Sequence, residues 1–217
     1  MRIIEALNRM QQILYIPFGE LFTETELANI IRAKGKTGQI LELALGLNLT
    51  SGGLDFEDGE LKTNKCDVNG KPLETMFICQ IASMIDDLLE SKPFEETYLF
   101  EKIDRILYVP VCKIGHPSEW YFYDAYIVDR SNPNYVEVYA QIEDDYYAIC
   151  EKLREHIKQT NNIHTSSGEL MQIRTKDSKP YHAIFSNMIG SYISNKNHAF
   201  YFKKEFMKRI KQIHNHE

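Results

Sequence analysis

The sequence lacks the patterns that define several common classes of protein. No eighteen apolar residues follow one another, so the chain offers no segment that could cross a membrane as a single helix. No H-E-x-x-H, no G-x-S-x-G and no phosphate-binding glycine loop occurs. The four cysteines form no C-x-x-C pair, which argues against a zinc knuckle and against disulfides: Cys66, Cys79, Cys112 and Cys150.

The N-terminal segment, MRIIEALNRMQQIL, has an amphipathic pattern without a long apolar run or a small-residue cleavage site. We therefore expect a helix there rather than a secretion signal, and a cytoplasmic protein. With 217 residues, 43% of them apolar, the chain can form one large core or two lobes that share a cleft.

Charge is distributed unevenly along the chain. The net charge of −6 argues at first against a nucleic-acid partner. Residues 170–217, however, carry nine basic and three acidic side chains, a net of +6, while the rest of the chain carries −12. A basic segment on an acidic body can bind a polyanion through its local potential. An ordinary lysine-rich C-terminal helix explains the same residues, and composition leaves both interpretations open.

Local patterns predict one mixed α/β domain without repeats or low-complexity linkers. Thr23 and Glu26 form a capping-box signature at the start of a helix over 23–34. Apolar residues recur at helical spacing over 135–158, and we expect the tyrosines among them to lie in the core. The remaining expected elements are helices over 34–47 and 204–213, and strands at 75–82, 103–112, 121–129, 169–176 and 199–204.

The stretch LDFEDGELKTNK at residues 54–65 is half charged and has apolar flanks. A solvated turn is the simplest explanation. The alternative is a metal site that hydrolyses phosphodiesters, because Asp55 and Glu60 could hold Mg²⁺ while Lys62 stabilises charge or orients water.

The segment MIDDLLESKP has the same pattern, an acidic residue followed after a gap by E-x-K, and comparing the two copies helps to choose between the turn and the metal site. In this copy Glu90 and Lys92 lie at the end of an expected helix, where residues two apart point roughly 200° apart. On an expected strand, Glu60 and Lys62 point to the same face. The first copy therefore suits a site, and the second suits a solvated helix end.

Six ordered segments give the sequence a resemblance to the MutH family of DNA endonucleases, which includes the mismatch-repair nicking enzyme and Sau-type restriction enzymes that cut GATC. The resemblance extends from about residue 32 to about residue 210. The segments are KGKTGQILELALGL, LDFEDGELKT, NGKPLETMFICQI, FEKIDRILYVPV, GELMQIRTK and AFYFKKEFMKRI.

The resemblance implies a PD-(D/E)xK restriction-endonuclease-like fold: a mixed β-sheet flanked by helices, with two lobes around a DNA cleft. Residues 1–217 would form a single endonuclease domain, with a catalytic lobe over about 1–130 and a DNA-reading lobe over about 131–217.

Roles follow from the family pattern position by position. Asp55, Glu60 and Lys62 match the catalytic triad, Glu42 an acid near the metal, and Lys102 a basic residue needed for cleavage. The implied metal-binding set is Asp55, Glu60 and Leu61, with Mg²⁺ as the cofactor and Mn²⁺ as an expected substitute.

DNA contacts are implied in the same way. Arg174 matches the residue that reads a guanine, a contact type that contributes about 1–3 kcal/mol against a wrong base. Lys176 would bind a phosphate, and Tyr201 matches the position that senses adenine methylation. The other implied DNA-binding residues are Lys34, Gly35, Lys203 and Lys204.

Two departures from the family pattern stand out. The gap from Asp55 to Glu60 is two residues shorter than in the nicking enzyme, which predicts a tighter loop and makes Asp58 a substitute ligand. Leu54 replaces the proline that usually precedes the first acid.

These residues suit more than one function. The sequence favours a type II restriction enzyme that cuts both strands at a short palindrome, GATC, because outside the motifs it departs widely from the repair enzyme. The alternative is a repair endonuclease that nicks the unmethylated strand of hemimethylated GATC. A DNA-binding module with a dead nuclease is a third possibility, against which the intact triad argues.

The expected partners follow from these interpretations. Double-stranded DNA is the substrate in each, and no membrane is involved. Restriction implies a cognate adenine methyltransferase, and repair implies a MutL-type activator. Because one chain carries one catalytic set, double-strand cutting requires a transient homodimer on DNA or two successive events.

Overall fold

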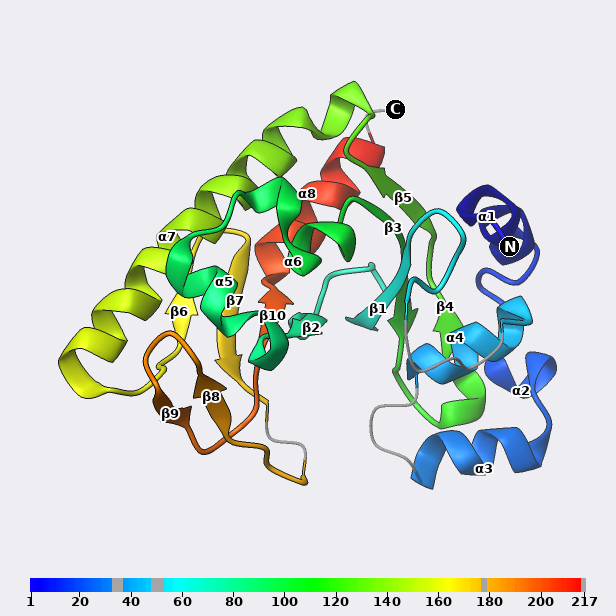
Figure 1. Cartoon of the computed structure of the whole chain (residues 1–217). Helices are drawn as coiled ribbons and strands as arrows, with labels where there is room; N and C mark the ends of the chain where they lie inside the picture. The colour runs from blue at the N-terminus through cyan, green and yellow to red at the C-terminus, as the bar shows by residue number, and fades with distance from the viewer. Residues whose placement is uncertain (33–36, 48–52, 177–178, 216–217) are drawn as a thin grey trace.

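The computed structural model describes residues 1–32, 37–47, 53–176 and 179–215 (Figure 1). Its α-helices are α1 (Ile3–Gln11), α2 (Phe18–Leu21), α3 (Glu24–Arg32), α4 (Thr37–Leu45), α5 (Ile85–Glu90), α6 (Tyr98–Glu101), α7 (Val136–Thr160) and α8 (Lys204–His214). Short 3₁₀ turns are η1 (Ala82–Met84), η2 (Phe94–Glu96), η3 (Pro117–Glu119) and η4 (Pro133–Tyr135). None of the helices in the described part of the chain is long and apolar enough to cross a bilayer.

The strands form two larger sheets and a hairpin. They are β1 (Glu60–Cys66), β2 (Met76–Gln80), β3 (Arg105–Cys112), β4 (Tyr121–Phe122), β5 (Tyr126–Asp129), β6 (Ser166–Ser167), β7 (Met171–Thr175), β8 (Ile184–Ser186), β9 (Ser191–Ser194) and β10 (His198–Phe202). One sheet contains β1, β3, β4 and β5, the other runs β2-β10-β7-β6, and β8 pairs with β9.

The first sheet is mixed and carries part of the charged stretch at residues 54–65. Strand β1 pairs parallel with β3, with Glu60 opposite Ile106, and β4 and β5 pair antiparallel with β3. Nearly every β3 side chain is buried, which explains its continuous apolar run. The expected mixed α/β architecture is confirmed.

The strand expected over 121–129 is wrong as a single element, because it divides into β4 and β5. Both halves still pair with β3. The interruption lies opposite Pro110, whose nitrogen has no hydrogen to donate to the ladder, while its carbonyl accepts from the Tyr123 amide. The cause therefore lies on the neighbouring strand.

The long helix α7 covers the second sheet, beside β6 and β7 (Figure 1). Its tyrosine stripe is buried, as expected: Tyr139 is 5% and Tyr146 0% exposed. The phenol of Tyr139 donates to the carbonyl of Ile103 at 2.7 Å, and that of Tyr146 to the carbonyl of Lys92 at 2.8 Å. The tyrosines thus belong to the core rather than to a stacking surface.

Buried side chains form two apolar clusters. The smaller joins α1, α4 and one face of β3, and the larger joins α5, α7, α8 and both sheets. The larger cluster includes residues on both sides of position 130, such as Ile106 and Ile149. The division into lobes at about that position stays a prediction.

The predicted N-terminal features are confirmed. An amphipathic helix, α1, buries Ile3, Ala6 and Met10. Helix α3 begins with the expected capping box, in which the Thr23 amide donates to Glu26 Oε2 at 2.8 Å. The β8–β9 hairpin has no counterpart among the expected elements, and it carries the exposed rings of Phe185 and Tyr192.

Candidate active site

A cavity of about 490 Å³ opens where β1 of one sheet approaches β2 of the other. Its wall brings together every catalytic and metal-binding residue that the sequence analysis names: Glu42, Asp55, Glu60, Leu61, Lys62 and Lys102. These come from α4, the loop before β1, β1 itself and the end of α6. The fold thus gathers residues up to sixty positions apart along the chain.

Glu60 is the centre of this group. It begins β1, is only 3% exposed, and accepts a hydrogen bond from each of two lysines. Lys62 Nζ lies 2.6 Å from Glu60 Oε2, and Lys102 Nζ lies 2.5 Å from Glu60 Oε1. Burial raises the pKa of Glu60, and the two ammonium groups oppose that rise. The strand geometry predicted for Glu60 and Lys62 is confirmed.

Lys102 is held by more than Glu60. Its ammonium also donates to the carbonyl of Gly53 at 2.5 Å and lies 5.3 Å from the centre of the Tyr98 ring. Burial tends to lower the pKa of Lys102, but the hydrogen bond and the charge of Glu60 outweigh it, so the pKa is raised. The side chain therefore stays charged beside Glu60.

Two further carboxylates complete the acidic side of the cavity. Asp55 Oδ2 accepts the Leu61 amide at 2.9 Å, which fixes the loop that presents it. Burial raises the pKa of Glu42, and the nearby charges of Asp55 and Glu60 raise it further. Glu42 is thus close enough to both acids to sense their charge.

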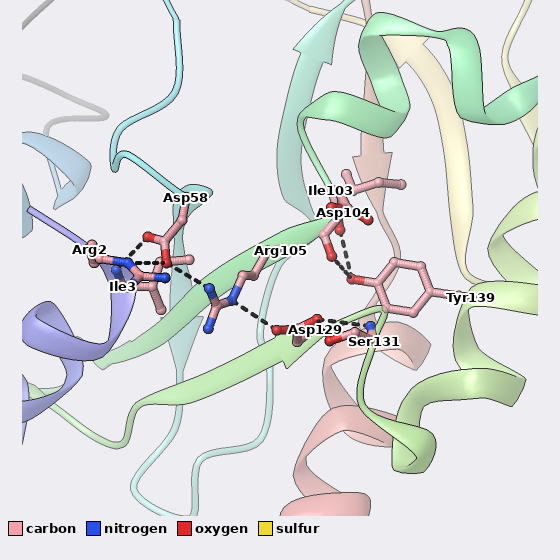
Figure 2. Close-up of polar contacts among 9 residues, drawn as sticks. All are labelled: Arg2, Ile3, Asp58, Ile103, Asp104, Arg105, Asp129, Ser131 and Tyr139. Atoms are coloured by element: carbon pink, nitrogen blue, oxygen red, sulfur yellow. Dashed lines mark hydrogen bonds and ion pairs between the residues drawn. The ribbon is translucent and has the colours of Figure 1, made fainter.

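Asp58 does not belong to this group. It is not among the described residues that line the cavity, and its carboxylate instead accepts from the Ile3 amide at 2.7 Å and from Arg105 Nη1 at 2.6 Å (Figure 2). The substitute-ligand role that the shortened spacing suggested for Asp58 is therefore wrong. Both of its oxygens are already engaged away from the cavity.

The residues expected to read DNA lie next to the cavity. The guanidinium of Arg174 stacks 4.3 Å over the Tyr201 ring, and Lys176 Nζ lies 4.3 Å over the Phe77 ring. Phe77 lines the cavity and meets Tyr201 edge to face at 5.7 Å. One row of cations and aromatic rings therefore runs from the β7–β10 pair to the catalytic group.

The other expected DNA-binding residues are placed differently. Lys203 Nζ donates to the carbonyl of Gly168 at 2.8 Å, beside the buried end of β7. Lys204 is exposed at the first turn of α8. Lys34 and Gly35 lie outside the described residues. The DNA-binding roles of these four residues stay predictions.

Comparison with known proteins finds relatives of one kind. The chain is 28% identical over 200 residues to the DNA mismatch repair protein MutH of Shewanella oneidensis, covering 84% of this chain and 80% of that protein. It is 29% identical over 184 residues to the MutH protein of Buchnera aphidicola, covering 82% and 80%, and 28% identical over 191 residues to that of Vibrio cholerae, covering 79% and 77%. These relatives support the resemblance to the MutH family of DNA endonucleases that the sequence motifs indicate. No family model matches the chain.

The architecture agrees with this resemblance, because the mixed sheet with flanking helices fits the restriction-endonuclease-like fold that the resemblance implies.

Sequence reasoning did not find Phe77, Tyr98 or Cys79, which also line this cavity. Phe77 is 37% exposed on a strand whose neighbours Met76 and Ile78 are buried, so an aromatic residue at an outward-facing strand position was the available signal. Tyr98 gave no such signal, because its contact with Lys102 depends on how α6 ends. Cys79 also lines the cavity, and burial raises the pKa of its thiol to about 12, as for a buried core cysteine.

The donor set of the cavity suits a hard divalent cation. Asp55 and Glu60 offer carboxylate oxygens, and Leu61 can offer only its backbone carbonyl, which are the ligand types that Mg²⁺ prefers. Among the described residues, no three acidic, histidine or cysteine side chains are grouped closely enough to hold a metal ion by themselves. The implied metal-binding set thus has two carboxylates, those of Asp55 and Glu60, and other ligands have to complete the coordination of any cation bound there.

Proposed function

We propose that this protein is a Mg²⁺-dependent endonuclease of the mismatch-repair type, which nicks the unmethylated strand of hemimethylated GATC. One observation carries the proposal: Glu60, buried and paired with Lys62 and Lys102, shares a cavity with Asp55. The comparisons support this repair role better than the restriction role that the sequence favoured.

The chemistry assigned to each residue follows from its place. Asp55, Glu60 and the Leu61 carbonyl would hold the cation, which when bound polarises a phosphoryl oxygen and lowers the pKa of a bound water. Lys62 reaches the same carboxylate and would stabilise charge on the phosphate or orient water. Lys102 opposes the rise in the pKa of Glu60 and holds its carboxylate in place, and Glu42 adds negative potential at the cavity wall.

Strand and site selection are assigned to the row beside the cavity. Arg174, exposed and stacked on Tyr201, would read a guanine, while Tyr201 would be crowded by an adenine N6-methyl group. Lys176 would contact a phosphate, and burial lowers the pKa of its ammonium. Phe77 would link the reading residues to the cavity, because it contacts both.

The proposal is tested by incubating purified protein and Mg²⁺ with supercoiled plasmid that carries a single GATC site in unmethylated, hemimethylated or fully methylated form. We expect open-circular product from the first two and none from the third, with stimulation by a MutL-type protein and ATP. Mn²⁺ should replace Mg²⁺, and a chelator should abolish the reaction.

Other outcomes discriminate among the alternatives. Linear product from unmethylated plasmid without an activator would instead support the restriction role. A plasmid that lacks GATC is the specificity control, and equal cutting of it would overturn the assigned site. Binding without cutting under every condition would support a module with a dead nuclease.

A further inference from the structure

The loop that joins Asp55 to Glu60 is held from outside the cavity. It closes a tight turn in which the Phe56 amide donates to the Gly59 carbonyl at 2.9 Å, and Phe56 is only 4% exposed in the smaller apolar cluster. By the family resemblance, this loop is two residues shorter than in the nicking enzyme. Small displacements within so short a loop would move both acids at its ends.

Asp58, at the middle of this loop, is fixed by two hydrogen-bond donors from other elements, and Arg2 Nε forms an ion pair with its Oδ2 at 3.4 Å (Figure 2). Its Oδ1 accepts the Ile3 amide at 2.7 Å, at the start of α1. Its Oδ2 accepts Arg105 Nη1 at 2.6 Å, at the start of β3. The loop is thereby tied to a helix and to the central strand of the first sheet.

Arg105 is itself held on its other side. Its Nε lies 2.9 Å from Asp129 Oδ2 at the end of β5, and Asp129 Oδ1 accepts from the Ser131 amide and hydroxyl at 2.8 and 2.6 Å (Figure 2). One guanidinium therefore bridges two aspartates. Only Asp58 belongs to the loop between the candidate metal-binding acids.

Gly59 allows the loop to lie directly against this strand. A Cβ at position 59 would come within 2.3 Å of the Arg105 carbonyl oxygen and 2.6 Å of Ile3 Cδ1. Any other side chain would have to push the loop off both elements that hold Asp58.

We propose that Asp58, Arg105 and the Ile3 amide form a clamp that positions Asp55 and Glu60 for binding the divalent cation. Asp58 and Arg105 are positioning residues, because they act through the loop and not on the substrate. The inference rests on the proposed function. Asp55 and Glu60 carry like charges in one cavity, so their separation has to be imposed by the backbone. A clamp outside the cavity imposes it without occupying a ligand position.

The test compares Asp58→Asn with Asp129→Asn. Each removes one negative charge from beside Arg105 at unchanged size. Asp58 accepts hydrogen bonds at both oxygens, whereas Asp129 accepts at Oδ1 and forms an ion pair with Arg105 through Oδ2, so each amide turns an NH₂ toward a donor or a cation. If the clamp positions the acids, Asp58→Asn alone raises the Mg²⁺ concentration for half-maximal nicking, by about 10-fold as for other residues that orient metal ligands. DNA affinity without metal should stay unchanged in both variants.

Amide hydrogen exchange provides a readout that needs no cleavage. In Asp58→Asn, exchange should accelerate across residues 55–61, including the Leu61 amide that Asp55 accepts, while Asp129→Asn leaves that segment at the wild-type rate. Gly59→Ala should show the same acceleration, provided that its far-ultraviolet circular dichroism matches wild type. Equal Mg²⁺ dependence and equal exchange in the two aspartate variants would overturn the clamp.

The outcomes for the clamp and for the proposed function are separable. If the wild-type protein nicks no DNA with Mg²⁺ or Mn²⁺, the proposed function fails, and the exchange experiment still decides whether Asp58 fixes the loop. If wild type nicks DNA and Asp58→Asn loses activity only in proportion to a lower melting temperature, Asp58 has a merely structural role and the clamp is wrong.

Discussion

The two acid, gap, E-x-K stretches of this chain have the same residue types and opposite structures. In the first, Glu60 and Lys62 lie on one face of β1, and their charged atoms meet at 2.6 Å within the cavity. In the second, Glu90 is exposed at the last position of α5, and Lys92 lies 3.5 Å from Asp87 instead. The same spacing thus gives a converging pair on a strand and a diverging pair on a helix.

Burial separates the two stretches as clearly as geometry does. Glu60 is held by lysines that are themselves nearly buried, whereas the Lys92–Asp87 pair is more than a third exposed on both sides and contributes little. Asp86, in the second stretch, accepts from Ser186 Oγ at 2.6 Å and from the Asn187 amide at 3.0 Å. The second stretch therefore supports the β8–β9 hairpin and has no chemical site.

The largest expected effect separates Glu60 from Glu90. Glu60→Gln should reduce nicking of hemimethylated plasmid by roughly 10³-fold or more, about 4 kcal/mol, because the cation loses a ligand. Glu90→Gln should leave the rate unchanged. Initial rates on one plasmid at equal protein concentration measure both, and comparable losses would abolish the distinction between the two stretches.

Substitution of one lysine from each stretch's neighbourhood should separate the two stretches again, with a smaller change in nicking rate. Lys102→Ala removes one of two ammonium groups that neutralise Glu60, and we expect nicking to fall by about 10²-fold, as for other charge-stabilising groups in protected sites. Lys92→Ala should be silent. Single-turnover rates with saturating protein separate this loss from any loss of DNA affinity, and an unchanged Lys102→Ala rate would leave Lys62 as the sole catalytic lysine.

The row of cations and aromatic rings that ends at Phe77 lies beside the first stretch, so we expect its residues to read DNA. Arg174→Ala should lower discrimination between GATC and a site with one altered base by about 1–3 kcal/mol. Lys176→Ala should weaken binding to all DNA sequences alike and make binding less dependent on salt concentration. Competition binding at two salt concentrations tests both, and a change of base preference in Lys176→Ala would reverse the assignment.

Much of this arrangement could be predicted from local sequence. The strand carrying Glu60 and Lys62, the helix carrying Glu90 and the buried tyrosines of α7 follow from periodicity and turn residues. The division of residues 121–129 could not, because its cause is Pro110 on a neighbouring strand. The approach of Lys102 to Glu60, 42 positions apart, could not be predicted from local patterns either. Only the family resemblance gave Lys102 a role. The clamp at Asp58 could not be predicted from local sequence, because its donors lie on α1 and β3.

The smallest expected effect is on stability. It depends on the pKa shifts of Asp86 and Glu60, which have opposite directions. Burial tends to raise the pKa of Asp86, but hydrogen bonds from Ser186 and Asn187 outweigh it and lower the pKa, whereas the pKa of Glu60 is raised. A lowered carboxyl pKa contributes stability above the unfolded value, which is lost as the pH falls through the folded one. A raised carboxyl pKa contributes stability at low pH, which is lost as the pH rises through the folded value, because the folded protein binds the proton more tightly than the unfolded chain.

Asp86→Asn should therefore lower the free energy of unfolding by about 1 kcal/mol near pH 7, from the lost hydrogen bonds. The deficit relative to wild type should shrink as the pH falls below about 4, the ordinary aspartate value, because the unfolded wild-type chain then binds a proton that folded Asp86 does not yet bind. Urea unfolding between pH 3 and pH 7 measures this difference, while nicking at neutral pH should be retained. A deficit that does not change with pH would mean that Asp86 acts by packing rather than by charge, and the contrast with Glu60 would reduce to geometry alone.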